Sequence, residues 1–228
     1  NTPDVLTEAV AEFTWALILN AARRVGEGER LLRSGAWKGW ALDFMLGMEL
    51  RGKQLGIIGH GRIGRAVAAK APAFGMDVAF ASRPRTAHGT RPERAADHAS
   101  RRTRPERAAD HASRRMSLDE LLVTSDVVSI HAPATPGTRH LIGRKELARM
   151  KRSALLVNTA RGSIVDEEAL AWALGERLIA GAALDVYERE PEVFAPLLSM
   201  EHAVLAPHLG SATRETRTAM AELAVRNV

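Results

Sequence analysis

The sequence predicts an α/β protein built on one parallel sheet with helices on both faces. From Leu55 onward, short apolar runs alternate with helical patterns, as expected for parallel strands joined by helices. A glycine-rich turn directly follows the first run. Polar residues follow the later runs, where the carboxyl ends of parallel strands gather and ligands bind.

Residues 1–50 are predicted to form a helical lead-in outside this sheet. Apolar residues at spacings of three and four predict an amphipathic helix over 7–25, closed by Gly26. A second helix is expected over 27–33. Trp37 and Trp40 lie in the apolar stretch that follows, and packing is the simplest interpretation of both.

The remaining elements alternate along the chain. Strands are expected over 55–58, 78–81, 127–130, 155–157, 180–184 and 203–205. Helices are expected over 62–71, 117–122, 144–150 and 166–174. The helix over 62–71 should end there, because Pro72 obstructs its continuation.

Positive charge is concentrated in one segment. The 228 residues carry a formal net charge of +5, and ten arginines against four acidic residues within 83–115 leave the rest near −1. In this segment 90–102 reads TRPERAADHASRR, and 103–115 repeats it letter for letter. Alanine is the repeat's only apolar residue, so 90–115 is expected to be a duplicated surface loop or frayed helix. Nucleic-acid binding stays an alternative, although this segment has no aromatic residue for base stacking.

Composition excludes several other classes. The chain has no cysteine, which excludes a disulfide framework and thiolate metal sites. Its apolar runs are far shorter than the roughly 20 residues of a membrane-spanning helix. We expect a cytoplasmic protein, since no export signal is recognisable. We also expect no metal site.

The first strand and turn indicate a dinucleotide site. The order strand, Gly59-His60-Gly61-Arg62-Ile63-Gly64 and helix gives each glycine a role. Gly59 makes the turn, Gly61 lets a pyrophosphate approach, and Gly64 lets the helix approach the strand. The helix N-terminus then offers amides to the phosphates. A glycine-rich turn without a ligand is the alternative.

The end of the second strand indicates which dinucleotide. Ser82 and then Arg83 and Arg85 stand where a carboxylate would meet a free ribose 2′-hydroxyl. Guanidinium groups pair well with a 2′-phosphate, so NADP is expected to be preferred, with NAD possible. Alternatively, both arginines merely begin the basic loop.

Three residues that follow separate later strands form a set that suits a small acid with a carbonyl group. Arg161 offers a cation for a substrate carboxylate, and His208 offers a proton donor for a carbonyl oxygen. Glu190 offers a carboxylate that orients the imidazole and favours its protonated form. Each of these residues alone would be ordinary in function, and only the three together support the hypothesis of a catalytic site.

Several motifs in order resemble the D-isomer-specific 2-hydroxyacid dehydrogenase family, particularly its glyoxylate and hydroxypyruvate reductase branch. They cover nearly the whole chain: NTPDVLTEAVAEF, RSGAWKGW, LGIIGHGRIGRAVA, HAPATPGTRHLI, MKRSALLVNTARGSIVDEEAL, GAALDVYEREP and PHLGSAT. The resemblance implies a Rossmann-type, doubly wound sheet. It also implies an oxidoreductase that transfers hydride between NADPH and a small 2-oxo or D-2-hydroxy acid.

The resemblance also assigns site residues. Arg161, Glu190 and His208 match the family's catalytic residues, and Asp185 matches its ligand for the nicotinamide carboxamide. The remaining cofactor-binding positions that it implies are Gly59, Gly61, Arg62, Ile63, Gly64, Ser82, Ala132, Pro133, Thr138, Thr159, Ala160, His208 and Gly210.

The resemblance sets limits as well. Family members carry a substrate domain built mainly from residues that precede this segment, so this chain alone is expected to bind cofactor and turn over little. Residues 1–50 resemble segments that join two nucleotide domains in the family, which implies a homodimer. A non-catalytic, dinucleotide-sensing corepressor of the same fold is the alternative, although it would not need the three catalytic residues.

Overall fold

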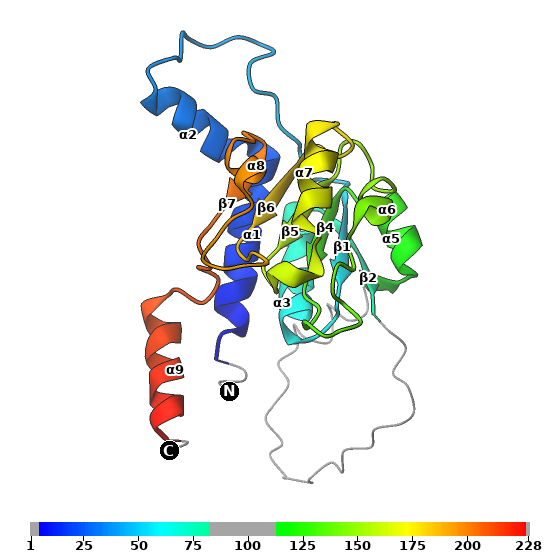
Figure 1. Ribbon diagram of the computed structural model, residues 1–228, viewed down its shortest axis with the longest axis vertical. Helices are drawn as coiled ribbons and strands as arrows, with labels where there is room; N and C mark the ends of the chain where they lie inside the picture. The colour runs from blue at the N-terminus through cyan, green and yellow to red at the C-terminus, as the bar shows by residue number, and fades with distance from the viewer. Residues whose placement is uncertain (1–4, 83–112, 227–228) are drawn as a thin grey trace.

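The computed structural model describes residues 5–82 and 113–226, and within them one sheet of seven strands forms the centre (Figure 1). The strand order is β3-β2-β1-β4-β5-β6-β7, and every neighbouring pair is parallel. The strands are β1 (Gln54–Ile58), β2 (Asp77–Ala81), β3 (Ser113–Arg115), β4 (Val127–Ile130), β5 (Leu155–Asn158), β6 (Gly181–Leu184) and β7 (Ala203–Leu205). The predicted doubly wound parallel sheet is confirmed.

Helices cover both faces of this sheet (Figure 1). On one face lie α1 (Thr7–Arg23) and α3 (Arg62–Lys70), the latter continued by the 3-10 turn η1 (Ala71–Phe74). The other face is covered by α5 (Leu118–Thr124), α6 (Arg144–Leu147) and α7 (Glu167–Gly175). The remaining helical elements are α2 (Val25–Arg33), η2 (Gly162–Ile164), α8 (Ala195–Leu198) and α9 (Arg214–Arg226).

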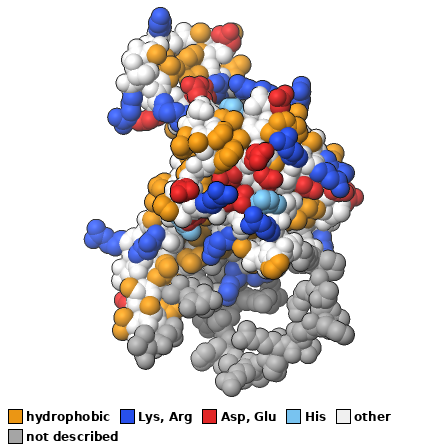
Figure 2. Space-filling view, in the orientation of Figure 1, with side chains coloured by type: hydrophobic (Ala, Val, Ile, Leu, Met, Phe, Trp, Pro, Cys, Tyr) orange, Lys and Arg blue, Asp and Glu red, His pale blue; other side chains and the backbone are white. Residues whose placement is uncertain are grey.

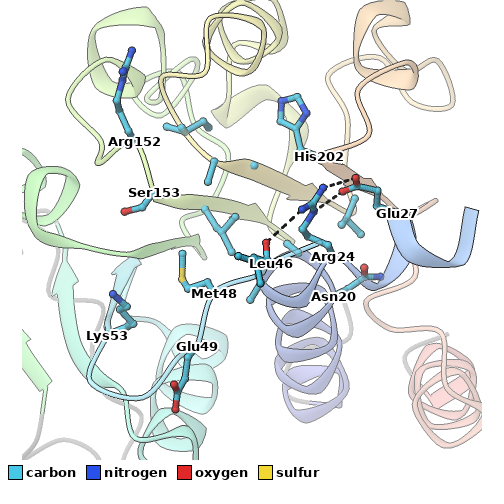
Figure 3. A pocket seen from close by; sticks show the side chains of 18 of the residues that line it. Asn20, Arg24, Glu27, Leu46, Met48, Glu49, Lys53, Arg152, Ser153 and His202 are labelled. Atoms are coloured by element: carbon cyan, nitrogen blue, oxygen red, sulfur yellow. Dashed lines mark hydrogen bonds and ion pairs between the residues drawn. The ribbon is translucent and has the colours of Figure 1, made fainter. Parts of the chain in front are cut away.

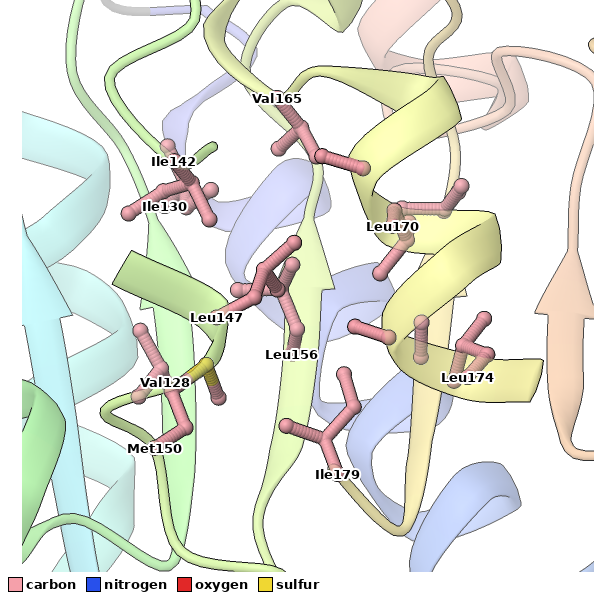
Figure 4. Packing of buried hydrophobic residues seen from close by; sticks show 14 of the residues in the cluster. Val128, Ile130, Ile142, Leu147, Met150, Leu156, Val165, Leu170, Leu174 and Ile179 are labelled. Carbon is pink, nitrogen blue, oxygen red and sulfur yellow. The ribbon is translucent and has the colours of Figure 1, made fainter. Parts of the chain in front are cut away.

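Two apolar cores hold the layers together. In the first, Val128 and Leu156 from the sheet pack against Leu147 of α6 and Leu170 of α7 (Figure 4). In the second, Trp15 of α1 stacks on Phe74 at a ring distance of 4.3 Å. The Trp15 indole also donates to the Val67 carbonyl at 3.0 Å. Both faces of the sheet are therefore covered by apolar packing, as a parallel sheet requires.

The first helix ends earlier than predicted. Arg24, rather than Gly26, adopts the left-handed conformation that closes α1, at φ 54°, and Gly26 lies inside α2. A bidentate ion pair stabilises this unusual arginine, because Arg24 donates to both oxygens of Glu27 at 2.8 and 2.6 Å. The Asn20 carboxamide also accepts from the Gly26 amide at 2.8 Å.

The predicted duplicated loop requires a correction. Ser113–Arg115, the tail of the second repeat copy, forms the edge strand β3 rather than a loop or helix. An edge strand gains its hydrogen bonds from one neighbour and needs no apolar stripe, so the repeat's composition did not reveal it. Residues 90–112 lie outside the described part of the chain.

The two tryptophans after α2 pack less than their simplest interpretation predicted. Trp37 and Trp40 are 51% and 79% exposed, so packing within this chain does not account for either side chain. Figure 2 shows apolar side chains on the upper projection formed by α2 and its following loop, and others on α9 below. Helices α8 and α9 were not predicted. Among the described helices, none has the length and apolar character needed to cross a membrane.

Candidate active site

The glycine fingerprint forms the predicted turn between β1 and α3. Gly59 has φ +96°, and a Cβ there would lie 2.6 Å from the Ala132 amide nitrogen. A Cβ on Gly64 would lie 2.2 Å from the Gly59 carbonyl oxygen, so the helix does approach the strand closely. A Cβ on Gly61 would meet nothing within 4 Å. The turn therefore leaves open space where a pyrophosphate was predicted.

The N-terminus of α3 faces this space with its backbone. Gly61 is the N-cap, and it has no side chain that could cap the helix. The dipole of a helix favours an anion at its N-terminus. His60 in the turn stacks on Phe80 of β2, with ring centroids 4.0 Å apart.

At the end of β2, Ser82 is exposed. Its carbonyl oxygen accepts a hydrogen bond from the Arg115 guanidinium of β3 at 3.4 Å. Arg83 and Arg85, predicted to bind a 2′-phosphate, lie outside the described residues. Arg115 was not predicted as a site residue, because its place beside Ser82 depends on the pairing of β3 with β2.

Glu190 and His208 come together after β6 and β7. Glu190 Oε2 lies 2.7 Å from His208 Nδ1, and Glu190 Oε1 accepts from the Tyr187 amide at 3.0 Å. Burial raises the pKa of Glu190, but hydrogen bonds from His208 and Tyr187 and the nearby charge of Arg161 outweigh it and give a net lowering. The carboxylate therefore stays ionised near neutral pH. His208 has φ 55° and an exposed side chain, so its ring is accessible.

Arg161 begins η2 on a rigid loop. The buried Asn158 side chain donates to the Arg161 carbonyl at 2.9 Å and accepts from the Ala160 amide at 3.0 Å. A Cβ on Gly162 would lie 1.9 Å from the Tyr187 carbonyl carbon, so this loop is pressed against the one after β6. The Arg161 side chain is exposed, beside the loop that carries Glu190.

Asp185 connects β6 to the His208 loop. Its carboxylate accepts from the Leu209 amide at 2.6 Å and from the Gly210 amide at 2.8 Å. Burial raises the pKa of Asp185, and these amide hydrogen bonds only partly offset that rise. The residue predicted to contact a carboxamide thus also fixes the backbone next to His208.

The predicted nicotinamide-side residues lie on the loop after β4. Thr138 is buried, and its hydroxyl donates to the Pro133 carbonyl at 2.8 Å and accepts from the Thr135 amide at 2.8 Å. Ala132 contacts the fingerprint turn. Burial lowers the pKa of the neighbouring His131 to about 3, so its ring is neutral at ordinary pH.

One histidine and two carboxylates form a cluster where the loops after β4, η2 and β6 meet. His140 Nε2 lies 2.9 Å from both oxygens of Glu188, and its Nδ1 lies 3.8 Å from Asp166. The spacing of the three residues is compatible with a metal ion. The contacts among the three residues join the loops after β4, η2 and β6.

Two hollows on the surface of the described residues can be compared with the candidate site. One, of about 480 Å³, is lined by Glu190 and His208 together with Tyr187, Leu205 and Pro207. A larger groove of about 910 Å³ lies at the amino ends of the strands, where Arg24, Lys53 and His202 line it (Figure 3). No predicted site residue lines this groove. The smaller hollow adjoins the candidate site, because Glu190 and His208 line it. It also lies at the carboxyl ends of the strands, where sheets of this kind bind their ligands.

The predicted site residues that the structure describes therefore lie along the carboxyl ends of the strands. Four strand spacings separate β1 from β7, which is about 19 Å. The fingerprint lies at one end of this span and the Glu190–His208 pair at the other. Such a fold and site define the class of dinucleotide-binding dehydrogenase domains.

Comparison with known proteins identifies the family. The sequence pattern of the "D-isomer specific 2-hydroxyacid dehydrogenase, NAD binding domain" matches residues 15–210. The chain belongs to this family, as the motifs had indicated. It is 52% identical to a glyoxylate reductase of Aeropyrum pernix over 233 residues, which cover 100% of this chain and 64% of that relative.

Two solved structures are similar along nearly the whole chain. A glyoxylate reductase from Paecilomyes thermophila has a TM-score of 0.83 and 38% identity, covering 99% of this chain and 62% of its own. An NADPH-dependent glyoxylate/hydroxypyruvate reductase from Sinorhizobium meliloti, in complex with NADP and malonate, has a TM-score of 0.81 and 35% identity, covering 99% and 64%. The chain thus spans just under two thirds of these proteins.

Proposed function

We propose that this chain is the NADPH-binding domain of a reductase that acts on small 2-oxo acids such as glyoxylate or hydroxypyruvate, yielding D-2-hydroxy acids where a stereocentre forms. The observation that carries the proposal is the 2.7 Å contact between Glu190 and His208 at the carboxyl edge of the sheet. An ionised carboxylate beside an accessible imidazole is an arrangement suited to proton transfer.

The fingerprint residues fit a dinucleotide. The open space at Gly61, at the N-terminus of α3, suits a pyrophosphate, which Arg62 and Ile63 would contact. Ser82 would meet the adenosine ribose, with Arg83 and Arg85 as further candidates. Ala132, Pro133, Thr138, Thr159, Ala160, Asp185 and Gly210 would surround the nicotinamide half.

Each catalytic side chain has a separate task. Arg161 holds the substrate carboxylate and polarises the neighbouring carbonyl. His208 donates a proton to the carbonyl oxygen during reduction and accepts it in the reverse direction. Glu190 orients the imidazole through Nδ1. A nicotinamide supplies the hydride when it is bound.

The names of the relatives support the substrate class. The Aeropyrum pernix relative is a glyoxylate reductase, and the Sinorhizobium meliloti enzyme is NADPH-dependent and acts on glyoxylate and hydroxypyruvate. Because this chain corresponds to about two thirds of such proteins, we expect it to bind dinucleotide without appreciable turnover by itself.

The test uses the full-length protein that contains this chain. His208→Gln should lower turnover of glyoxylate with NADPH by about two to four orders of magnitude, the usual scale of general acid catalysis. His202→Gln is the control, because His202 lies at the opposite edge of the sheet. Near-normal turnover of the His208 variant would overturn the proposed mechanism.

We also propose that two copies associate through the lead-in. Leu32, Trp37, Trp40 and Leu42 are 61%, 51%, 79% and 83% exposed on and after α2, and such a gathering of large apolar side chains favours an interface. Sedimentation at micromolar concentration should show a dimer. Trp40→Ser combined with Leu42→Ser should give monomers, whereas Val225→Ser, at a 77% exposed position on α9, should not. A monomeric parent protein would refute the assignment.

A further inference from the structure

The tail of the repeated segment contributes a strand to the sheet. Ser113–Arg115 pairs in parallel with β2, with Phe80 opposite Arg115. The Met116 amide continues the pairing by donating to the Phe80 carbonyl at 3.0 Å. The last arginine of the repeat is therefore held at the carboxyl end of β2.

This pairing sets the direction of the Arg115 side chain. Residues in register on parallel strands lie on the same face of a sheet, and successive residues alternate between faces. Arg115 consequently shares a face with Phe80, on which His60 of the fingerprint turn stacks. Arg114 is in register with Ala79 and points to the opposite face.

The Arg115 guanidinium lies where the ribose end of a dinucleotide would be. It donates to the Ser82 carbonyl at 3.4 Å, and both residues are exposed. A guanidinium offers several N–H groups in a planar fork, so the contact with one carbonyl uses only part of its donor capacity. Fork geometry and fixed charge together suit a dianionic phosphate.

From this geometry we infer that Arg115 is a specificity-determining residue for a dinucleotide with a 2′-phosphate. The inference rests on the proposed NADPH-binding function and adds a residue from β3 to it. Arg115 pairs with the 2′-phosphate beside Ser82, so the edge strand formed by the repeat selects NADPH over NADH. A 2′-hydroxyl has no charge to pair with, so NADH does not benefit from the contact.

The experiment compares two neighbouring arginines of β3. Dissociation constants for NADPH and NADH are measured by fluorescence titration of the parent chain, Arg115→Gln and Arg114→Gln. Both variants remove one positive charge from adjacent positions. Arg115→Gln should weaken NADPH binding by roughly 10- to 100-fold, the scale of a charge-assisted hydrogen bond. Its affinity for NADH should change by less than about threefold, and Arg114→Gln should affect both ligands by no more than that.

Competition by 2′,5′-ADP and 5′-AMP locates the effect at the 2′-phosphate. The Arg115 variant should lose affinity for 2′,5′-ADP and keep its affinity for 5′-AMP. Equal losses for both nucleotides, or equal effects of the two arginine substitutions, would overturn the role of Arg115. If the parent binds neither NADPH nor NADH, the proposed function itself fails. If the parent binds NADPH and Arg115→Gln leaves that affinity intact, only the present inference fails.

The repeat offers a second, independent test. Deleting 90–102 or 103–115 gives the same protein, because the two copies are identical. The shortened chain keeps Ser-Arg-Arg directly before Met116, so β3 and its final arginine are retained. NADPH affinity should stay within about threefold of the parent value. A loss as large as that expected for Arg115→Gln would show that the strand tail is insufficient and would refute the inference.

Discussion

The hydroxyl groups of Thr14 and Thr159 lie 2.9 Å apart in the interior of the protein. Thr14 belongs to α1, and Thr159 stands two residues before Arg161 on the loop after β5. The first helix is thereby hydrogen-bonded to the loop that carries the proposed substrate-binding arginine. The Thr14 hydroxyl also lies 2.7 Å from the Val10 carbonyl, to which it donates.

Thr14→Val should destabilise the fold. The substitution keeps the side-chain shape but removes the partner of the buried Thr159 hydroxyl. An unsatisfied buried hydroxyl costs about 1–3 kcal/mol, measurable by urea unfolding. Thr14→Ser retains a hydroxyl and should preserve the hydrogen bond. If the serine variant is no more stable than the valine variant, the hydrogen bond is not the cause.

Glu190→Gln in the full-length protein should lower turnover. The Glu190 carboxylate lies 2.7 Å from Nδ1 of His208 and holds the imidazole in place, so its removal should misplace the proton donor. We expect the rate of glyoxylate reduction to fall by about 10- to 1000-fold. Glu192→Gln, two residues away and exposed, is the control. Near-normal turnover by the Glu190 variant would contradict this role.

Ser82→Asp should reverse the preference between the two dinucleotides. A carboxylate at the end of β2 repels a 2′-phosphate and accepts a hydrogen bond from a 2′-hydroxyl. NADPH affinity should therefore fall by at least about tenfold, while NADH affinity rises. Ser82→Asn, similar in size but uncharged, should change the ratio far less. Tighter NADH binding by the parent chain would overturn the proposed preference before any variant is made.

Gly64→Ala should destabilise the domain and weaken dinucleotide binding. The added Cβ would lie 2.2 Å from the Gly59 carbonyl oxygen, so α3 must shift away from the turn. Overpacking of this kind costs about 1–3 kcal/mol. Gly175→Ala is the matched control, because its Cβ would meet nothing within 4 Å and alanine favours a helix by about 0.5–1 kcal/mol. In thermal unfolding, the melting temperature should fall for Gly64→Ala and rise for Gly175→Ala.

Glu167→Gln should alter how stability depends on pH. Burial raises the pKa of Glu167 above its ordinary value of 4.5. Its favourable contribution to folding is therefore present at low pH and is lost as pH rises through the raised pKa. Relative to the parent, the glutamine variant should gain stability as pH rises from the ordinary value of 4.5 through the raised pKa. Glu168→Gln, whose side chain is 77% exposed, should show a smaller change, and a difference independent of pH would refute the assignment.

Local pattern carried most of the fold prediction. Six of the seven strands in the described part of the chain follow from apolar runs and turns, and the close approach at Gly64 depends on β1 and α3, which flank the turn. Strand β3 was not predicted, because an exposed edge strand needs backbone partners and no apolar residues. The end of α1 was misplaced, since an ion pair with Glu27 stabilises the left-handed Arg24.

Local patterns in the sequence were enough to predict the sheet class and the glycine fingerprint, because these depend on short-range periodicity and turn chemistry. The places of Glu190 and His208 after separate strands, together with the family resemblance, also led us to expect that the carboxylate meets the imidazole, and the two lie 2.7 Å apart. Only the folded chain revealed that Thr14 meets Thr159 and that Arg115 meets Ser82, across 145 and 33 positions of the sequence. These two contacts depend on strand order and helix packing across the whole sheet, which no local segment of the chain specifies.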